Sequence, residues 1–148
     1  MLENTLSSYP LTLVFNIVSG LIWIGLAGLL PEPMRQKTQV VIVAMAGGVY
    51  LIGSLGVWEV PLSLALLGFA YLGLTHYWGI GAAWLTHAGI DLLHHLNASP
   101  LVPTLPLSSV GCATLDMVLA IWFFCNAPAL VPLSIGRFSV SHTLSDQP

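Results

Sequence analysis

Charged residues are scarce in this sequence, at 6% of 148 residues, against about a quarter in an ordinary soluble domain. Three basic residues cannot neutralise a phosphate backbone, so nucleic-acid binding is excluded. So few charges also cannot cover a water-facing surface, while the hydrophobic fraction is 56% and the mean hydropathy is +0.88. We therefore expect an integral membrane protein, and neither a soluble enzyme nor a disordered chain.

Cysteine and basic N-terminal residues are also scarce. The two cysteines, Cys112 and Cys125, fall in one apolar segment that reads as a single helix, so we expect no disulfide framework. The first four residues carry no basic side chain, which is unlike the start of a cleavable signal peptide. We expect the first apolar segment to stay in the mature protein.

Apolar segments divide the sequence into five candidate membrane spans, of which the first, 9–30, carries no charged residue. A spanning helix needs about 20 mostly apolar residues, and prolines end the first span and mark the connectors before the third and fifth, because proline cannot continue a helix. The expected spans are residues 9–30, 39–57, 62–78, 80–96 and 107–127, followed by a peripheral tail at 128–148. The expected fold class is all-α, an integral membrane bundle of about five transmembrane helices in a single membrane domain, 1–148.

Basic residues indicate the orientation of this bundle. Arg35 and Lys37 lie in the first loop and Arg137 in the tail, which are on the same side of a five-span bundle. Basic residues favour the cytoplasmic side, so we expect the N-terminus outside and the C-terminus inside. In a bacterium this places the protein in the cell membrane.

Ionisable side chains concentrate in the fourth expected span, although each is costly inside a membrane. His87, Asp91, His94 and His95 stand at i, i+4, i+7 and i+8. At about 100° per residue these four side chains share one face of a helix. Such residues usually face the interior of a bundle, where they mark a functional site.

The fifth expected span carries a matching polar face, made of Ser109, Cys112 and Asp116. A short proline-rich connector makes the fourth and fifth helices antiparallel neighbours. At ~1.5 Å per residue, His87 and Asp116 reach similar depths in the membrane. We therefore expect these two side chains to meet near the middle of the bilayer.

Imidazole nitrogens and carboxylate oxygens are ligands that suit a divalent transition metal such as zinc or iron. The expected metal ligands are His87, Asp91, His94 and Asp116. His95 or Glu59 is the expected general base, and the competing interpretation of Glu59 is a solvated loop acid. For the cluster as a whole, a proton or ion pathway and purely structural pairing of two helices remain open.

The spacing of these residues also resembles a known pattern. The segment from His87 to His95 reads His-x-x-x-Asp-x-x-His-His, and the segment from Gly111 to Asp116 reads Gly-Cys-Ala-x-x-Asp. Together with an upstream Trp58-Glu59, they resemble an uncharacterised family of small multi-pass membrane proteins, a domain of unknown function. The resemblance covers about residues 56–128 and implies a membrane location without an activity.

Two enzyme groups are loosely similar to the histidine pattern. Membrane desaturases use His-x-x-His-His boxes, but their di-iron sites need more histidines than the five of this chain. Ceramidase-type membrane hydrolases need fewer histidines, together with an aspartate and a serine, although in a different order along the chain. A hydrolase is therefore favoured over an oxidase.

The sequence thus predicts a metal-dependent membrane enzyme that acts on a lipid or other apolar substrate. One alternative is a small proton- or metal-ion transporter or channel, which with so few spans would work as a homo-oligomer. The other is a structural subunit of a membrane complex. The expected partner is membrane lipid.

Overall fold

The computed structural model describes residues 2–49 and 55–128, with side chains from Ser8 onward, and within these ranges every regular element is helical. The helices are α1 (Leu2–Ala27), α2 (Met34–Gly48), α3 (Glu59–Leu72), α4 (Tyr77–Leu96) and α5 (Ser108–Phe124), with a short 3-10 helix, η2 (Gly56–Trp58), before α3. The predicted all-α fold class is confirmed for this part of the chain. The expected tail, with Arg137, lies almost wholly outside it.

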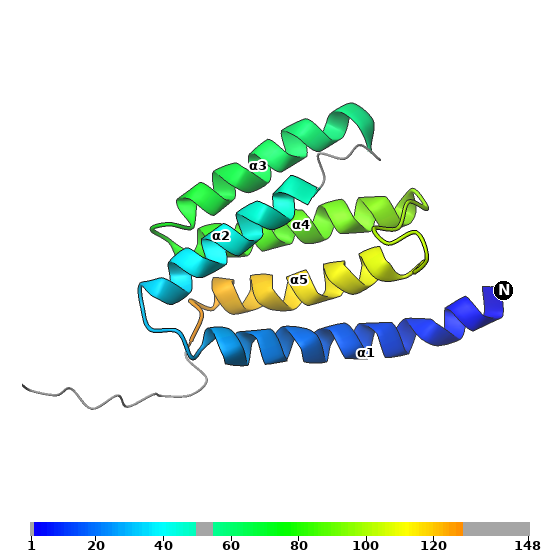
Figure 1. Cartoon of the computed structure of the whole chain (residues 1–148), viewed down its shortest axis with the longest axis horizontal. Coiled ribbons are helices and arrows are strands. Elements are labelled where there is room, and N and C mark those ends of the chain that lie inside the picture. The colour runs from blue at the N-terminus through cyan, green and yellow to red at the C-terminus, as the bar shows by residue number, and fades with distance from the viewer. Residues whose placement is uncertain (1, 50–54, 129–148) are drawn as a thin grey trace, which may run out of the picture.

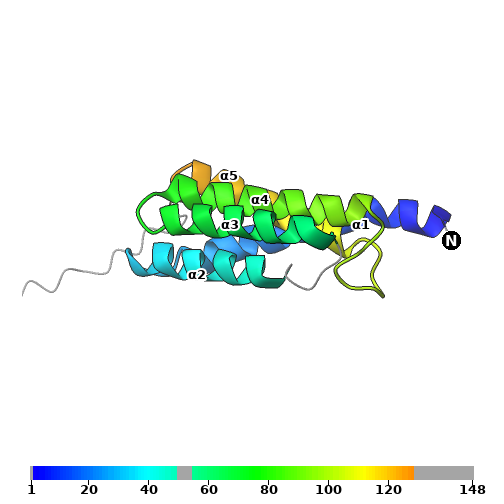
Figure 2. The same cartoon turned by 90° about the horizontal axis from the view of Figure 1, so that it is seen from above.

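The helices run alternately in opposite directions and form an elongated bundle (Figure 1). α4 is the central element, since it contacts α2, α3 and α5, while α1 packs along α5. Figure 2 shows α2 displaced to one side of α3 and α4. The polar face of α4 is therefore enclosed by neighbouring helices from several directions.

Close backbone contacts fix the turn between α3 and α4. A Cβ atom on Gly79 would lie 2.5 Å from the Gly73 nitrogen and 2.7 Å from the Leu72 carbonyl carbon, so the two helix ends touch there. α3 ends at Leu72, and His76 has the extended backbone (φ −137°, ψ 125°) of a residue that precedes a helix. His76 therefore lies in the turn, and not inside the third helix as the expected span 62–78 implied.

Helix length bears on the expected spans. α2 has 15 residues and α3 has 14, and at ~1.5 Å per residue both are shorter than the ~30 Å hydrocarbon layer of a bilayer. Within the described ranges one segment, Ser8–Ala27, is long and apolar enough to cross a membrane. A core helix or a signal sequence passes the same test, so the topology of five spans stays a prediction.

A polar cluster joins three helices where α2 and α4 begin. Arg35 Nε donates a hydrogen bond to Glu32 Oε1 at 2.6 Å, and the Tyr77 hydroxyl donates to the same carboxylate. The Arg35 guanidinium also lies 5.8 Å from the centre of the Trp122 ring on α5. Arg35 is buried as a result, although the sequence placed it in a loop. The cluster ties the starts of α2 and α4 to the end of α5.

The contact at Gly79 gives a first prediction. We expect Gly79→Ala to lower the free energy of unfolding by about 2 kcal/mol or more, because the added methyl group meets backbone atoms that cannot move aside. Gly89→Ala in the same helix is the matched control, since nothing lies within 4 Å of its Cβ position. Thermal unfolding in detergent compares the two variants. Equal stability would contradict the close packing of α3 against α4.

The Glu32 carboxylate gives a second prediction. Burial raises its pKa, but hydrogen bonds from Tyr77 and Arg35 outweigh burial, and the pKa lies below the ordinary value. This contribution to stability is present above the unfolded-state pKa of about 4.3 and is lost as the pH falls through the folded-state pKa. We expect the wild type to lose more stability than Glu32→Gln between about pH 5 and pH 3. Denaturant unfolding at both pH values measures this, and equal losses would contradict it.

Candidate metal centre

Three buried side chains from α4 and α5 converge at the contact between these helices. His87 Nδ1 lies 2.6 Å from Asp116 Oδ2, within hydrogen-bond distance, and 3.7 Å from Asp91 Oδ2. His87, Asp91 and Asp116 are 8%, 0% and 3% exposed. One ligand atom from each lies within 4.8 Å of the others, so the group could hold a metal ion. The predicted meeting of His87 and Asp116 is confirmed.

Helix geometry explains why these side chains meet. His87 and Asp91 are four residues apart, so their side chains are neighbours on one face of α4. The connector before α5 is held at its α5 end, where Leu101 N donates to Ser109 Oγ and Val102 N donates to Ser108 Oγ, both at 3.0 Å. These bonds help to fix the position of α5 along α4 and so bring Asp116 opposite His87.

α2 closes a third side of the group. The main chain of Ala46, near the end of α2, lies beside the His87 ring. Histidines that bind metals commonly donate their second ring N–H to a backbone carbonyl, which fixes the orientation of the ring. The environment of His87 therefore includes the kind of partner that a metal-binding histidine uses.

His94 lies near the C-terminal end of α4 and faces α3. Its Nε2 is 3.9 Å from Glu59 Oε1, and both residues are buried, at 3% and 2% exposed. Glu59 also accepts a hydrogen bond of 2.6 Å from Leu55 N. His94 was expected as a fourth ligand, but the group that could share one ion contains His87, Asp91 and Asp116. Glu59 is a buried partner of His94 and not a solvated loop acid.

His95 points toward a different helix from His94. Its Nε2 lies 2.9 Å from the Tyr9 hydroxyl of α1, and its side chain lines a small cavity beside Pro100 and Leu107. Adjacent helix residues are rotated by about 100°, which separates the surroundings of His94 and His95. The two expected bases, Glu59 and His95, thus lie against different elements, Glu59 on α3 and His95 against α1.

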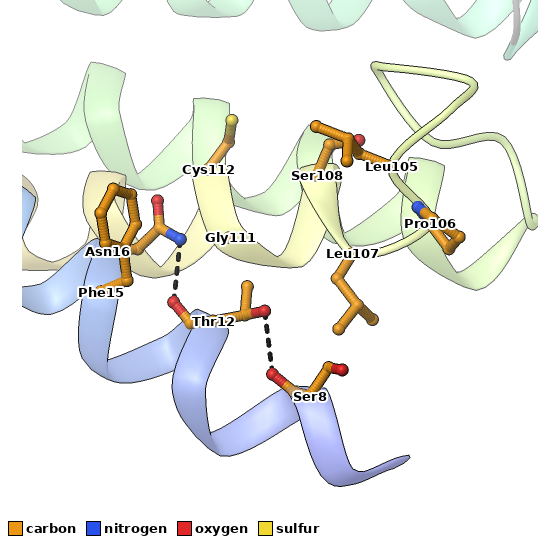
Figure 3. A pocket seen from close by; sticks show the side chains of 10 residues that line it. All are labelled: Ser8, Thr12, Phe15, Asn16, Leu105, Pro106, Leu107, Ser108, Gly111 and Cys112. Atoms are coloured by element: carbon orange, nitrogen blue, oxygen red, sulfur yellow. Dashed lines mark hydrogen bonds between the residues drawn. The ribbon is translucent and has the colours of Figure 1, made fainter. Parts of the chain in front are cut away.

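A groove of 610 Å³ lies between the first half of α1 and the start of α5 (Figure 3). Its lining is formed by Ser8, Thr12, Phe15, Asn16, Leu105, Pro106, Leu107, Ser108, Gly111 and Cys112. The Thr12 hydroxyl and the Asn16 amide donate to carbonyls of their own helix, at 3.0 Å and 2.9 Å. These hydrogen-bond donors are therefore already used within α1. Cys112 lies one turn before Asp116 on α5, which brings the groove close to the buried group.

Trp84 is a buried neighbour of the group that was not among the expected site residues. Its indole ring meets the His87 ring edge to face, with centroids 5.8 Å apart. Trp84 is 5% exposed, and its Nε1 has no hydrogen-bond partner among the described residues. The available signal was its position on the helix face that carries His87. His76, by contrast, lies at the opposite end of α4, where it is exposed and hydrogen-bonded to Thr75.

Comparison with known proteins adds a family but no activity. The model of a family of unknown function, DUF6010, matches residues 11–129. This range includes most of α1, the group of His87, Asp91 and Asp116, and the buried pair of Glu59 and His94. No curated protein matches the chain, and no solved structure matches it. The chemistry of the buried group is therefore the available guide to function.

Proposed function

Because the chain belongs to this family of unknown function, we propose its activity from the buried group itself: a metal-dependent membrane hydrolase that acts on a lipid or other apolar substrate. The observation that carries the proposal is the convergence of His87, Asp91 and Asp116, whose ligand atoms lie within 4.8 Å of one another. In this proposal the three side chains bind one divalent transition-metal ion, zinc or iron.

The donor set supports a catalytic ion. One nitrogen and two carboxylate oxygens suit zinc or ferrous iron, and catalytic zinc sites commonly have three protein ligands and one open position for water. Ligand atoms around a tetrahedral zinc ion are roughly 3.3 Å apart. The 2.6 Å between His87 Nδ1 and Asp116 Oδ2 is a hydrogen-bond distance, so an ion would replace this bond and separate the two atoms slightly.

The composition of the group favours hydrolysis over oxidation. Iron enzymes that activate dioxygen often use two histidines and one carboxylate, whereas this group has one histidine and two carboxylates. A bound divalent metal lowers the pKa of a water ligand enough to supply hydroxide near neutral pH. In hydrolysis of an ester or amide, the water oxygen bonds to the carbonyl carbon, the bond to the leaving group breaks, and the leaving group takes up the proton.

The buried pair of Glu59 and His94 is the proposed proton acceptor. It lies about one helical turn from Asp91 along α4, and both of its members are shielded from solvent. A general base must lie within reach of the water it deprotonates, directly or through one further water. His95 was the other expected base, but its contact with Tyr9 turns it toward α1.

The exposed surface supports a membrane location and an apolar substrate. α1 presents large apolar side chains outward, among them Leu11 and Phe15 at 74% and 68% exposed. Of the apolar stretch within Ser8–Ala27, 17% is buried inside the fold, which is unlike the core helix of a soluble protein. The groove beside Cys112 gives an apolar molecule a place to bind close to the proposed metal.

A proton or ion pathway is the second candidate, because the Glu59–His94 pair continues the line of buried titratable groups along α4. A pathway across the membrane would have to continue toward His76 at the other end of the helix. The intervening stretch of α4 instead buries Ile80 and Ala83 completely among apolar neighbours. This observation favours an enzyme over a continuous pathway.

Metal content is the direct test of the proposed site. We expect detergent-purified wild type to bind about one equivalent of zinc or iron, in keeping with a single three-ligand site. Asp91→Asn and Asp116→Asn keep the side-chain shape and are expected to weaken metal binding at least about 10-fold. His76→Gln is the matched control. His76 is an exposed histidine in the turn before α4, far along the helix from the proposed ligands, so this substitution should leave the metal content unchanged. Elemental analysis after reconstitution measures this, and a wild type without metal would contradict the proposal.

Hydrolysis is tested on the same preparations. Wild type loaded with metal is expected to release fatty acid from lipid esters or amides in mixed micelles, and chelation should abolish the release. Glu59→Gln is expected to retain metal while losing activity. If the protein binds metal but hydrolyses no lipid ester or amide, the proposed hydrolase activity is contradicted and the proposed metal site is not.

Membrane insertion is a separate prediction. We expect the protein to remain in the membrane fraction after extraction at alkaline pH, because its outward apolar side chains are stable only in lipid. Release into the alkaline supernatant would contradict the proposed location.

A further inference from the structure

Trp84 differs from the other tryptophans in the surroundings of its indole N–H group. Trp23 Nε1 donates to Gln39 Oε1 at 3.2 Å, and Trp122 Nε1 donates to the Pro128 carbonyl at 3.1 Å. Trp58 and Trp78 are 70% and 47% exposed, so neither ring is enclosed within the fold. Trp84 is buried, and no described residue accepts its N–H. A buried donor without an acceptor destabilises a fold, so this N–H calls for an acceptor that is not part of the described chain.

The ring that carries this donor lies beside a residue of the proposed metal centre. Trp84 precedes His87 by three residues, on the same face of α4, and the two rings meet edge to face with centroids 5.8 Å apart. Indole N–H groups donate and never accept, so the missing partner must carry an oxygen or another acceptor. The acceptor that the proposed chemistry supplies beside His87 is an oxygen in the open position of the metal.

We propose that Trp84 donates a hydrogen bond to an oxygen ligand of the metal, and that this ligand is a carboxylate, the product of hydrolysing a carboxylic ester or amide. The inference rests on the proposed metal site and narrows its substrates to acyl compounds. Trp84 is then a residue that positions the acyl oxygen, while His87, Asp91 and Asp116 hold the ion. A carboxylate can bind the metal and also accept the indole N–H hydrogen bond at an oxygen, and its negative charge strengthens this bond.

Acetate binding to the cobalt-loaded protein tests this inference without an activity assay. Cobalt(II) has visible absorption bands that change when a ligand enters its coordination shell, and acetate represents the product carboxylate. We expect acetate to perturb the bands of the wild type. In Trp84→Phe, which keeps a ring but lacks the N–H, cobalt stoichiometry should be unchanged while the Kd for acetate rises about 10-fold, the effect of one lost charge-assisted hydrogen bond.

Trp23→Phe is the matched control, because the Trp23 N–H already has a partner in Gln39. It should leave the acetate Kd at the wild-type value. Equal acetate affinity in wild type and Trp84→Phe, with cobalt bound in both, would overturn the role of Trp84 and leave the metal site intact. A wild type that binds no cobalt would instead overturn the proposed metal site, so the two failures are distinguishable.

A measurement on the wild type covers the case in which Trp84→Phe does not fold. Indole N–H resonances of ¹⁵N-tryptophan protein report each ring separately, and cobalt broadens the signal of the ring nearest the ion. In the zinc-loaded protein, acetate should shift this signal, and in the metal-free protein it should not. A signal that ignores acetate in the zinc-loaded protein would overturn the inference.

Discussion

The buried contact between His87 and Asp116 constrains the rest of the structure. A carboxylate and an imidazole that are almost fully removed from solvent are costly unless they face each other, so α4 and α5 must keep one register. A shift of one residue along either helix would turn the side chain by about 100° and break the contact. Two contacts support this register. At one end of the bundle the connector is hydrogen-bonded to the Ser108 and Ser109 hydroxyls, and at the other end the cluster around Arg35 joins α2, α4 and α5.

Much of this contact was predictable because it depends on spacing within single helices. The intervals between His87, Asp91 and His94 fix their angles on α4, and a short connector requires α5 to run back along α4. The position of Asp116 follows from these two facts. The depth of the group in a bilayer does not follow from them, because it depends on what surrounds the bundle. The number of residues that could share one ion does not follow either, because it depends on how α2, α3 and α5 pack around α4.

The surroundings of the remaining polar residues depend on contacts that the local pattern does not contain. His94 and His95 are adjacent and look equivalent, yet one pairs with Glu59 of α3 and the other with Tyr9 of α1. The tertiary packing of the helices decides which helix lies on each side of α4, and the spacing of residues within α4 does not contain this information. The end of α3 was misplaced for the same reason, since it is set by the contact of Gly79 with Leu72 and Gly73.

The packing of α1 against α5 explains why a groove lies near the buried group of His87, Asp91 and Asp116. Gly111 and Gly20 let α1 approach α5 closely, since a Cβ on Gly111 would lie 2.7 Å from Asn16 Nδ2 and one on Gly20 would lie 3.0 Å from Val118 Cγ1. Asn16 and Gly111 also line the groove, which continues from this contact along Ser8 and Thr12 of α1 and along Leu105–Leu107 of the connector. α4 meanwhile receives α2, α3 and α5 around its polar face. His87, Asp91 and Asp116 therefore stay shielded from solvent, while the groove between α1 and α5 ends one helical turn from Asp116, at Cys112.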